Sequence, residues 1–202
     1  WQMFKNTFDA ALLVNSDLPD TTLVGAYVWK HNSSVGNYAD RTAFNMFNDD
    51  EGAFMLTAQN KSIEGLTLTG TFYSAAEVPV AGDTTIVWGD AKFKISDYSV
   101  ALQGGQIDTD NVDATTAFGA KVGAKLGMFN LSAAYSSVDE DGAVGITNLG
   151  TGVKSPLYTQ MVLNNVGQYH AAPGSEFIKV GGSAKVLGGT VKAFYGMGTN
   201  DN

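Results

Sequence analysis

The strongest constraint on this chain is a period-two alternation of apolar and polar residues, which recurs in paired segments along its length. It is clearest over residues 116–126. One set of alternate positions there is Phe118, Ala120, Val122, Ala124 and Leu126, and the other is Ala117, Gly119, Lys121, Gly123 and Lys125. Because successive side chains of a strand point to opposite faces, the pattern predicts a β-strand with one apolar face.

Five pairs of such segments predict five hairpins, and therefore about ten strands. The pairs are 9–16 with 21–32, 53–61 with 66–75, 84–94 with 98–107, 116–126 with 129–136, and 177–187 with 190–197. Short turns join the members of each pair, for example Gly127-Met128 and Gly188-Gly189. A tilted strand crosses a bilayer in roughly 9–11 residues, and most of these segments reach that length.

The connections between hairpins are longer than the turns within them, and this parity favours a membrane barrel over a soluble sandwich. The long connections are 33–52, 76–83, 108–113 and 139–175. Membrane barrels have short periplasmic turns and longer external loops. The second face of the strands carries Lys, Asp and Gly, which do not fill a dry core well. We therefore expect an all-β fold, an antiparallel transmembrane β-barrel whose apolar face meets lipid.

Composition excludes several other classes of protein. The chain has no cysteine, which removes disulfide scaffolds, thiolate metal sites and cysteine nucleophiles. It has no run of about 18 apolar residues, so no membrane-spanning helix is expected. The net charge is −8, whereas binding to nucleic acid needs a basic surface, so nucleic acid is not an expected partner.

The two ends of the sequence give a further expectation about the length of the protein. The chain begins at Trp1 without a segment resembling a signal peptide, and it ends at Asn202 without the terminal aromatic residue common in bacterial barrels. We therefore expect residues 1–202 to be a single transmembrane barrel segment that is incomplete at both ends.

Three stretches of the sequence resemble the Campylobacter-type major outer-membrane porins of the epsilon class of proteobacteria. They are NTFDAALLVNSDLPDTTLVGAYV at 6–28, KSPLYT at 154–159 and AFYG at 193–196. The resemblance extends over most of the chain and is most specific in its first thirty or so residues. It implies a porin of a Gram-negative outer membrane, about twice as long as this chain, with about 18 strands, assembled as a homotrimer. Calcium binding is also implied by the resemblance.

The expected function is passive diffusion of ions and small hydrophilic solutes through a water-filled channel in the bacterial outer membrane. The long connections hold twelve acids and only two bases, Arg41 and Lys154. The acids are Asp40, Asp49, Asp50, Glu51, Glu77, Asp83, Asp108, Asp110, Asp113, Asp139, Glu140 and Asp141. An acidic mouth concentrates cations, which predicts a weak cation preference. Alternatively, the acids only solvate the surface or bind divalent ions that bridge lipopolysaccharide.

Charged residues at alternate positions are candidates for the pore lining. They are Asp90, Lys92, Lys94, Lys121 and Lys125. These side chains either form the charge ladder of a constriction or are simply the polar face of a wet lumen. The connection 139–175 is too long for a plain surface loop, so it is expected to fold into the pore, cover the mouth or reach a neighbouring subunit.

Asp108, Asp110 and Asp113 are a candidate calcium site, because hard oxygen donors at nearby positions suit that ion. The EF-hand pattern is not met, and an ordinary solvated turn rich in Asp and Asn is the alternative. Calcium is the only cofactor that the sequence indicates.

Two other functions remain open beside the porin. An outer-membrane enzyme would need a histidine paired with a carboxylate or serine, and neither His31 nor His170 stands in a catalytic motif, so no enzymatic activity is expected. A barrel that serves as a scaffold or adhesin with exposed binding loops is the second alternative. Tyr27, Trp29, Tyr73, Tyr98 and Tyr135 are candidates for the aromatic girdles of a membrane barrel.

Overall fold

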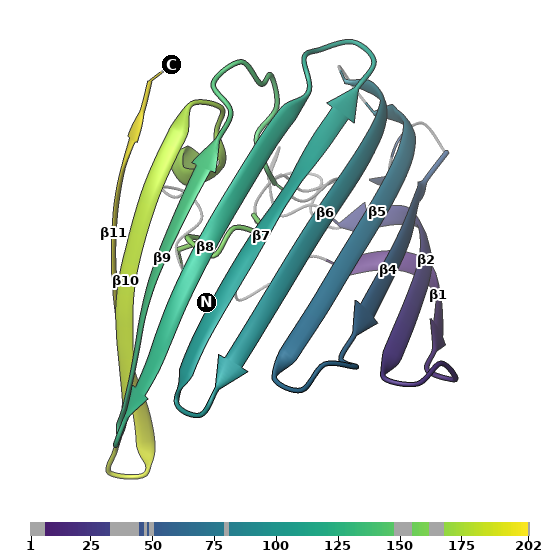
Figure 1. Cartoon of the computed structure of the whole chain (residues 1–202). Helices are drawn as coiled ribbons and strands as arrows, with labels where there is room; N and C mark the ends of the chain where they lie inside the picture. Colours follow the sequence, from purple (N-terminus) through teal and green to yellow (C-terminus); the bar gives the residue numbers. More distant parts are fainter. Residues whose placement is uncertain are drawn as a thin grey trace.

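The computed structural model describes residues 7–32, 45–46, 48, 51–78, 81–147, 155–161 and 168–201, which form one antiparallel sheet (Figure 1). Its strands are β1 (Thr7–Asn15), β2 (Thr21–Asn32), β3 (Asn45–Met46), β4 (Ala53–Asn60), β5 (Leu66–Val78), β6 (Gly82–Ile95), β7 (Tyr98–Thr109), β8 (Thr115–Leu126), β9 (Phe129–Val138), β10 (Ser175–Val186) and β11 (Gly189–Asn200). A short 3-10 turn, η2 (Gln168–Ala171), precedes β10. In these ranges no helix has the length and apolar character needed to cross a membrane.

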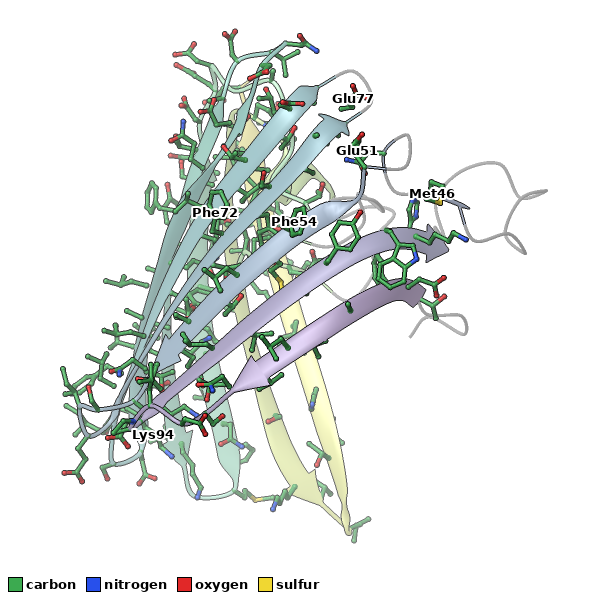
Figure 2. The ribbon with its side chains drawn as sticks, turned by 90° about the vertical axis from the view of Figure 1, so that its right-hand side faces the viewer. Met46, Glu51, Phe54, Phe72, Glu77 and Lys94 are labelled. Carbon is green, nitrogen blue, oxygen red and sulfur yellow. The ribbon has the colours of Figure 1, made fainter. Side chains whose placement is uncertain are left out.

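Each of the ten long strands pairs with its neighbour in sequence, and the two-residue strand β3 pairs with β2. The sheet therefore follows the up-and-down order of a membrane barrel, and it curls into an open trough (Figures 1 and 2). The predicted all-β antiparallel barrel fold and its five hairpins are confirmed, and the trough is part of a larger barrel wall.

The short turns depend on residues with positive φ, as tight hairpins of right-twisted strands require. Gly65 and Gly127 have φ of 76° and 60°, and Ser96 has 53°. The last turn is one residue earlier than the sequence indicated. It consists of Leu187 and Gly188, both with positive φ, and Gly189 already pairs with Val186.

The prediction of a long connection over residues 76–83 is wrong. Strand β5 extends to Val78 and β6 begins at Gly82, and these two residues pair with one another. The pairing continues because the strand bulges at Glu77, which has a φ of 50°. The Glu77 N–H donates a hydrogen bond to the Asp83 carboxylate at 3.0 Å, which closes the bulge. This connection is therefore as short as the turns at the opposite end.

The convex face of the trough is apolar over most of its strands. Alternate residues of the central and later strands project there as exposed large hydrophobic side chains: Phe54, Leu56, Leu68, Phe72, Val87, Phe93, Val100, Leu102, Phe118, Val122, Ile178, Val180, Val191 and Met197. Figure 2 shows Phe54 and Phe72 in this set. A soluble protein rarely exposes so large an apolar surface, whereas a barrel in lipid requires it.

Aromatic side chains on this outward face agree in part with the predicted girdles. Tyr27 stacks with Trp29 and packs against Phe54, with ring centroids 5.8 and 4.7 Å apart. The prediction that Tyr73 belongs to a girdle is wrong, because its side chain lies on the opposite, inner face and packs against a buried cluster there. The two-residue period of β5 places it on the face of Thr71 rather than that of Phe72.

Aromatic rings of the inner face occupy the space beside glycines of the neighbouring strand. Trp88 pairs with Gly105, and a Cβ added to Gly105 would lie 2.5 Å from the indole and 2.2 Å from the Val87 carbonyl oxygen. Phe194 covers Gly181 in the same way. These glycines allow large rings to lie along the wall instead of projecting from it.

We expect Gly105→Ala to destabilise the barrel by about 1–3 kcal/mol, because the new methyl group overpacks a position closed by backbone and indole. Unfolding in urea measures this difference in stability, and the heat-dependent shift in gel mobility reports the folded fraction at each urea concentration. Gly70→Ala is the matched control, since nothing lies within 4 Å of its added Cβ. Equal stability of the two variants would contradict the described packing of Trp88.

Candidate functional site: the inner wall and the inserted segment

Residues 155–161, here called the inserted segment, lie on the inner face of the trough. Leu157 is 2% exposed and belongs to a buried cluster with Ile86, Ile107 and Ala117 from β6, β7 and β8. Val138, Ile146 and Ala171 complete the cluster. The described part of the connection 139–175 therefore lies on the inside of the sheet, which agrees with the first of its three predicted roles, folding into the pore. Whether it narrows a pore stays a prediction.

Hydrogen bonds fix the backbone of the inserted segment to the wall. The side-chain amide of Gln103 donates to the Pro156 carbonyl at 3.1 Å and accepts from the Tyr158 N–H at 3.0 Å, with the amide oriented to satisfy both. The hydroxyls of Ser136 and Thr159 are 2.6 Å apart, and both residues are fully buried. Because these polar groups are excluded from water, losing one partner would leave the other unsatisfied at a cost of about 1–3 kcal/mol.

Asp90 is held in a small charged network beside the segment. Its carboxylate accepts a hydrogen bond from the Tyr158 hydroxyl and forms an ion pair with the Lys92 ammonium at 2.8 Å. Burial, together with the hydrogen bond and negative charge of Asp90, raises the pKa of Tyr158, so the phenol stays protonated and remains a donor. The charge of Asp90 is therefore largely compensated.

Lys179 binds the far end of the inserted segment. Its ammonium group donates to the Gln160 carbonyl at 2.5 Å and lies 3.5 Å from the Tyr158 carbonyl oxygen. It also lies 5.1 Å from the centroid of the Phe194 ring, a cation–π geometry. Within the described ranges the one salt bridge is that of Lys92, so Lys179 is held by carbonyls and a ring rather than by a carboxylate.

All five predicted lining residues lie on the inner face. Lys94, Lys121 and Lys125 border an open hollow of about 440 Å³ near the short turns, together with Lys192. Asp90 and Lys92 lie further from the short turns, beside Tyr158 of the inserted segment. That these side chains line a conducting pore stays a prediction.

The described acids predicted for the mouth lie at the opposite end, where the longer connections are. They are Glu51, Glu77, Asp83, Asp108, Asp110, Asp113, Asp139, Glu140 and Asp141. Figure 2 shows Glu51 and Glu77 at this end and Lys94 at the other. Asp40, Arg41, Asp49, Asp50 and Lys154 lie outside the described residues. The wall therefore has an acidic rim and a basic inner surface nearer the short turns.

The proposed calcium ligands Asp108, Asp110 and Asp113 are not gathered into a site. Among the described residues no three His, Cys, Asp or Glu side chains are arranged to hold a metal ion. Asp110 instead donates its backbone N–H to the Asp83 carbonyl, which ties this loop to the start of β6. Calcium binding stays a prediction, and it would require these three carboxylates to be drawn together.

His170 lies in η2 and is buried, at 2% exposed. Its ring packs edge-on against Phe177, and neither nitrogen has a hydrogen-bond partner among the described residues. Burial, with a further contribution from the charge of Lys179, lowers the pKa of His170 to about 4. His31 lies on β2, opposite Phe8.

We expect the imidazole of His170 to titrate near pH 4 in the folded protein, against about 6.5 in an unfolded chain. Since the unfolded chain binds the proton more tightly, the stability that neutral His170 provides is complete above about pH 6.5 and is lost as pH falls toward 4. Histidine ring signals in NMR spectra measure this pKa, and His31→Gln assigns them. Titration of His170 near 6.5 would contradict its described burial.

Sequence reasoning missed the residues that hold the inserted segment, namely Gln103, Ser136 and Lys179. The apolar anchor in the described part of the connection is Leu157. The available signal was the apolar pair Pro156-Leu157 within a polar connection.

Comparison with known proteins identifies the fold. No family model and no curated protein matches the chain. Among solved structures, it is similar to Pseudomonas aeruginosa OccK11 (OpdR), at a TM-score of 0.76 and 15% identity over 98% of this chain and 55% of that one. It is also similar to OpdO of the same organism (TM-score 0.73, 14% identity, 96% and 53% covered) and to OccK8 (OprE) (0.72, 15%, 96% and 57%).

These neighbours are outer-membrane porins, so the chain has the fold of an outer-membrane porin barrel. The localisation expected from the sequence, the bacterial outer membrane, agrees with this fold. The chain spans about half the length of the solved structures that it matches.

Proposed function

We propose that the protein forms a water-filled channel for passive diffusion of ions and small hydrophilic solutes across the outer membrane. One observation carries this proposal: the outward face of the sheet is apolar, whereas its inner face bears charged side chains and a segment folded against it. A wall of this kind separates lipid from water, and the segment narrows the water-filled side.

We further propose a weak cation preference, because most of the described acids lie at the end with the longer connections. A rim of one sign raises the local concentration of the opposite ion. An outward face that meets membrane lipid and lipopolysaccharide, and assembly as a homotrimer, complete the proposal. The resemblance to Campylobacter-type porins supports the trimer, and the particular family stays part of the proposal.

A preference for anionic solutes is the second candidate, and the inner wall favours it. In strands β6–β11, Lys92, Lys94, Lys121, Lys125, Lys179, Lys185 and Lys192 lie on the inner face. Asp90 is the one carboxylate of these strands on the same face, and Lys92 and Tyr158 compensate it. Asp97, in the turn between β6 and β7, also borders the hollow, beside four lysines. If the narrowest part of the channel lies at the level of these lysines, their positive potential there outweighs the negative potential of the acidic rim.

The reversal potential of the native protein in a planar bilayer, under a gradient of potassium chloride, separates the two candidates. A potential that favours potassium supports the cation preference, and Asp108→Asn, Asp110→Asn and Asp113→Asn combined should weaken it. A potential that favours chloride supports the second candidate, and Lys94→Met, Lys121→Met and Lys125→Met combined should then reduce the preference. A folded barrel without any conductance would favour a scaffold or adhesin with exposed loops.

A further inference from the structure

The lysines of the inner wall are not equivalent, and Lys179 differs from the others in what its ammonium group contacts. Lys94, Lys121, Lys125 and Lys192 border an open hollow, where solvent and solutes reach them. Lys92 is paired with Asp90. Lys179 is half-buried and donates to the backbone of the inserted segment at Gln160, with Tyr158 also in reach.

The contacts of Lys179 stabilise the later end of the segment, at Tyr158 and Gln160. Gln103 binds the first half through Pro156 and the Tyr158 N–H, and Leu157 packs into the buried cluster. After Thr159, the described contacts between the segment and the wall are the Lys179 ammonium group on the Gln160 carbonyl and the Met161 sulfur beside Gly196 of β11. A charged donor on a carbonyl forms a stronger hydrogen bond than a neutral donor does.

We propose that Lys179 is a positioning residue, whose ammonium group holds the 158–160 backbone against β10 and thereby fixes the width of the channel. Its cation–π contact with Phe194 restrains the lysine side chain along the wall, so that the amine stays directed at the segment. The effect on channel width rests on the proposed porin function, whereas the effect on the position of the segment does not.

Chemical labelling tests the positioning role without any channel measurement. The chain has no cysteine, and Thr159, which belongs to the segment, is fully buried. A single cysteine introduced by Thr159→Cys should therefore react slowly with a water-soluble maleimide in the folded protein. Adding Lys179→Met should raise the rate at least tenfold, because the segment then separates from β10 more often. Adding Lys179→Arg, which keeps a charged donor, should restore slow labelling.

Lys185→Met is the matched control, because it removes the same charge from the same face of β10, six residues further along and outside the described contacts of the segment. It should leave the labelling rate at the level of Thr159→Cys alone. Equal labelling rates in the Lys179→Met and Lys185→Met backgrounds would overturn the proposal. The heat-dependent gel shift verifies folding in every variant, and if Lys179→Met fails to fold, Lys179→Gln takes its place.

Single-channel recording then tests the consequence for the channel. Lys179→Met should give noisy openings with several conductance levels, whereas Lys185→Met should give steady openings. Faster labelling with steady openings would overturn the link to channel width and leave the positioning role intact. No conductance from the unmodified folded protein would instead overturn the porin function, and the labelling result would still stand.

Discussion

Replacing Leu157 by aspartate is expected to detach the inserted segment from the inner wall. Leu157 is almost fully buried among Ile86, Ile107 and Ala117, so a carboxylate there would lack any partner. Placing an unpaired charged group in an apolar site costs several kcal/mol, and about 3 kcal/mol corresponds to roughly a hundredfold change in an equilibrium. The labelling rate of Thr159→Cys should therefore rise by on the order of a hundredfold, and the mean conductance should increase.

Leu157→Met is the control for this substitution, because a swap that conserves volume and apolar character usually costs less than about 1.5 kcal/mol. It should label slowly and conduct as the unmodified protein does. If Leu157→Asp behaves like Leu157→Met in both measurements, the segment is not held by the buried cluster.

An arginine in place of Leu102 is expected to prevent assembly of the barrel in the membrane. Leu102 lies near the middle of β7, on the outward face, and is 57% exposed. A charged side chain at the bilayer midplane costs about 2–4 kcal/mol on the lipid face of a barrel. The variant should lose most of its heat-resistant folded band and should be degraded in cells.

Ser99→Arg tests the same strand on its other face. Ser99 projects inward beside Lys121 and Lys94 in the open hollow, where water solvates a charge. This variant should fold at the level of the unmodified protein, although one more cation in the hollow should shift ion selectivity toward chloride. Equal loss of folding in the two variants would contradict the assignment of the outward and inward faces.

The strands could be predicted from sequence because the side chains of each strand point alternately to the lipid face and to the inner face along its length. In β8 the apolar set from Phe118 to Leu126 and the mixed set from Ala117 to Lys125 lie on opposite faces. The structure pairs the strand with β7 and β9 in a register that keeps the two sets apart. The same alternation placed all five lining candidates on the inner face. Tyr73 was misassigned because an aromatic residue near a strand end fits either face, and its position depends on the buried cluster, which is built from distant segments.

The contacts of the inserted segment could not be predicted, because they join residues far apart in the chain. Tyr158 and Asp90 are 68 residues apart, and Ser136 and Thr159 are 23 apart. A periodic pattern of apolar residues gives no information about contacts between residues so far apart in the sequence. The bulge at Glu77 was missed for a related reason, since an Asp side chain rather than a glycine or proline stabilises it. Sequence pattern therefore defined the wall, whereas the contacts of the inserted segment required the structure.

Uptake of uncharged sugars into proteoliposomes tests the water-filled channel most directly, because it does not depend on ion preference. The native protein is reconstituted into dextran-loaded vesicles, and swelling is followed in solutions of a pentose, a disaccharide and a tetrasaccharide at equal osmolarity. A narrowed water-filled channel predicts fast swelling with the pentose and progressively slower swelling with the larger sugars. Vesicles that contain correctly folded protein and swell with none of these sugars would contradict the proposed porin function.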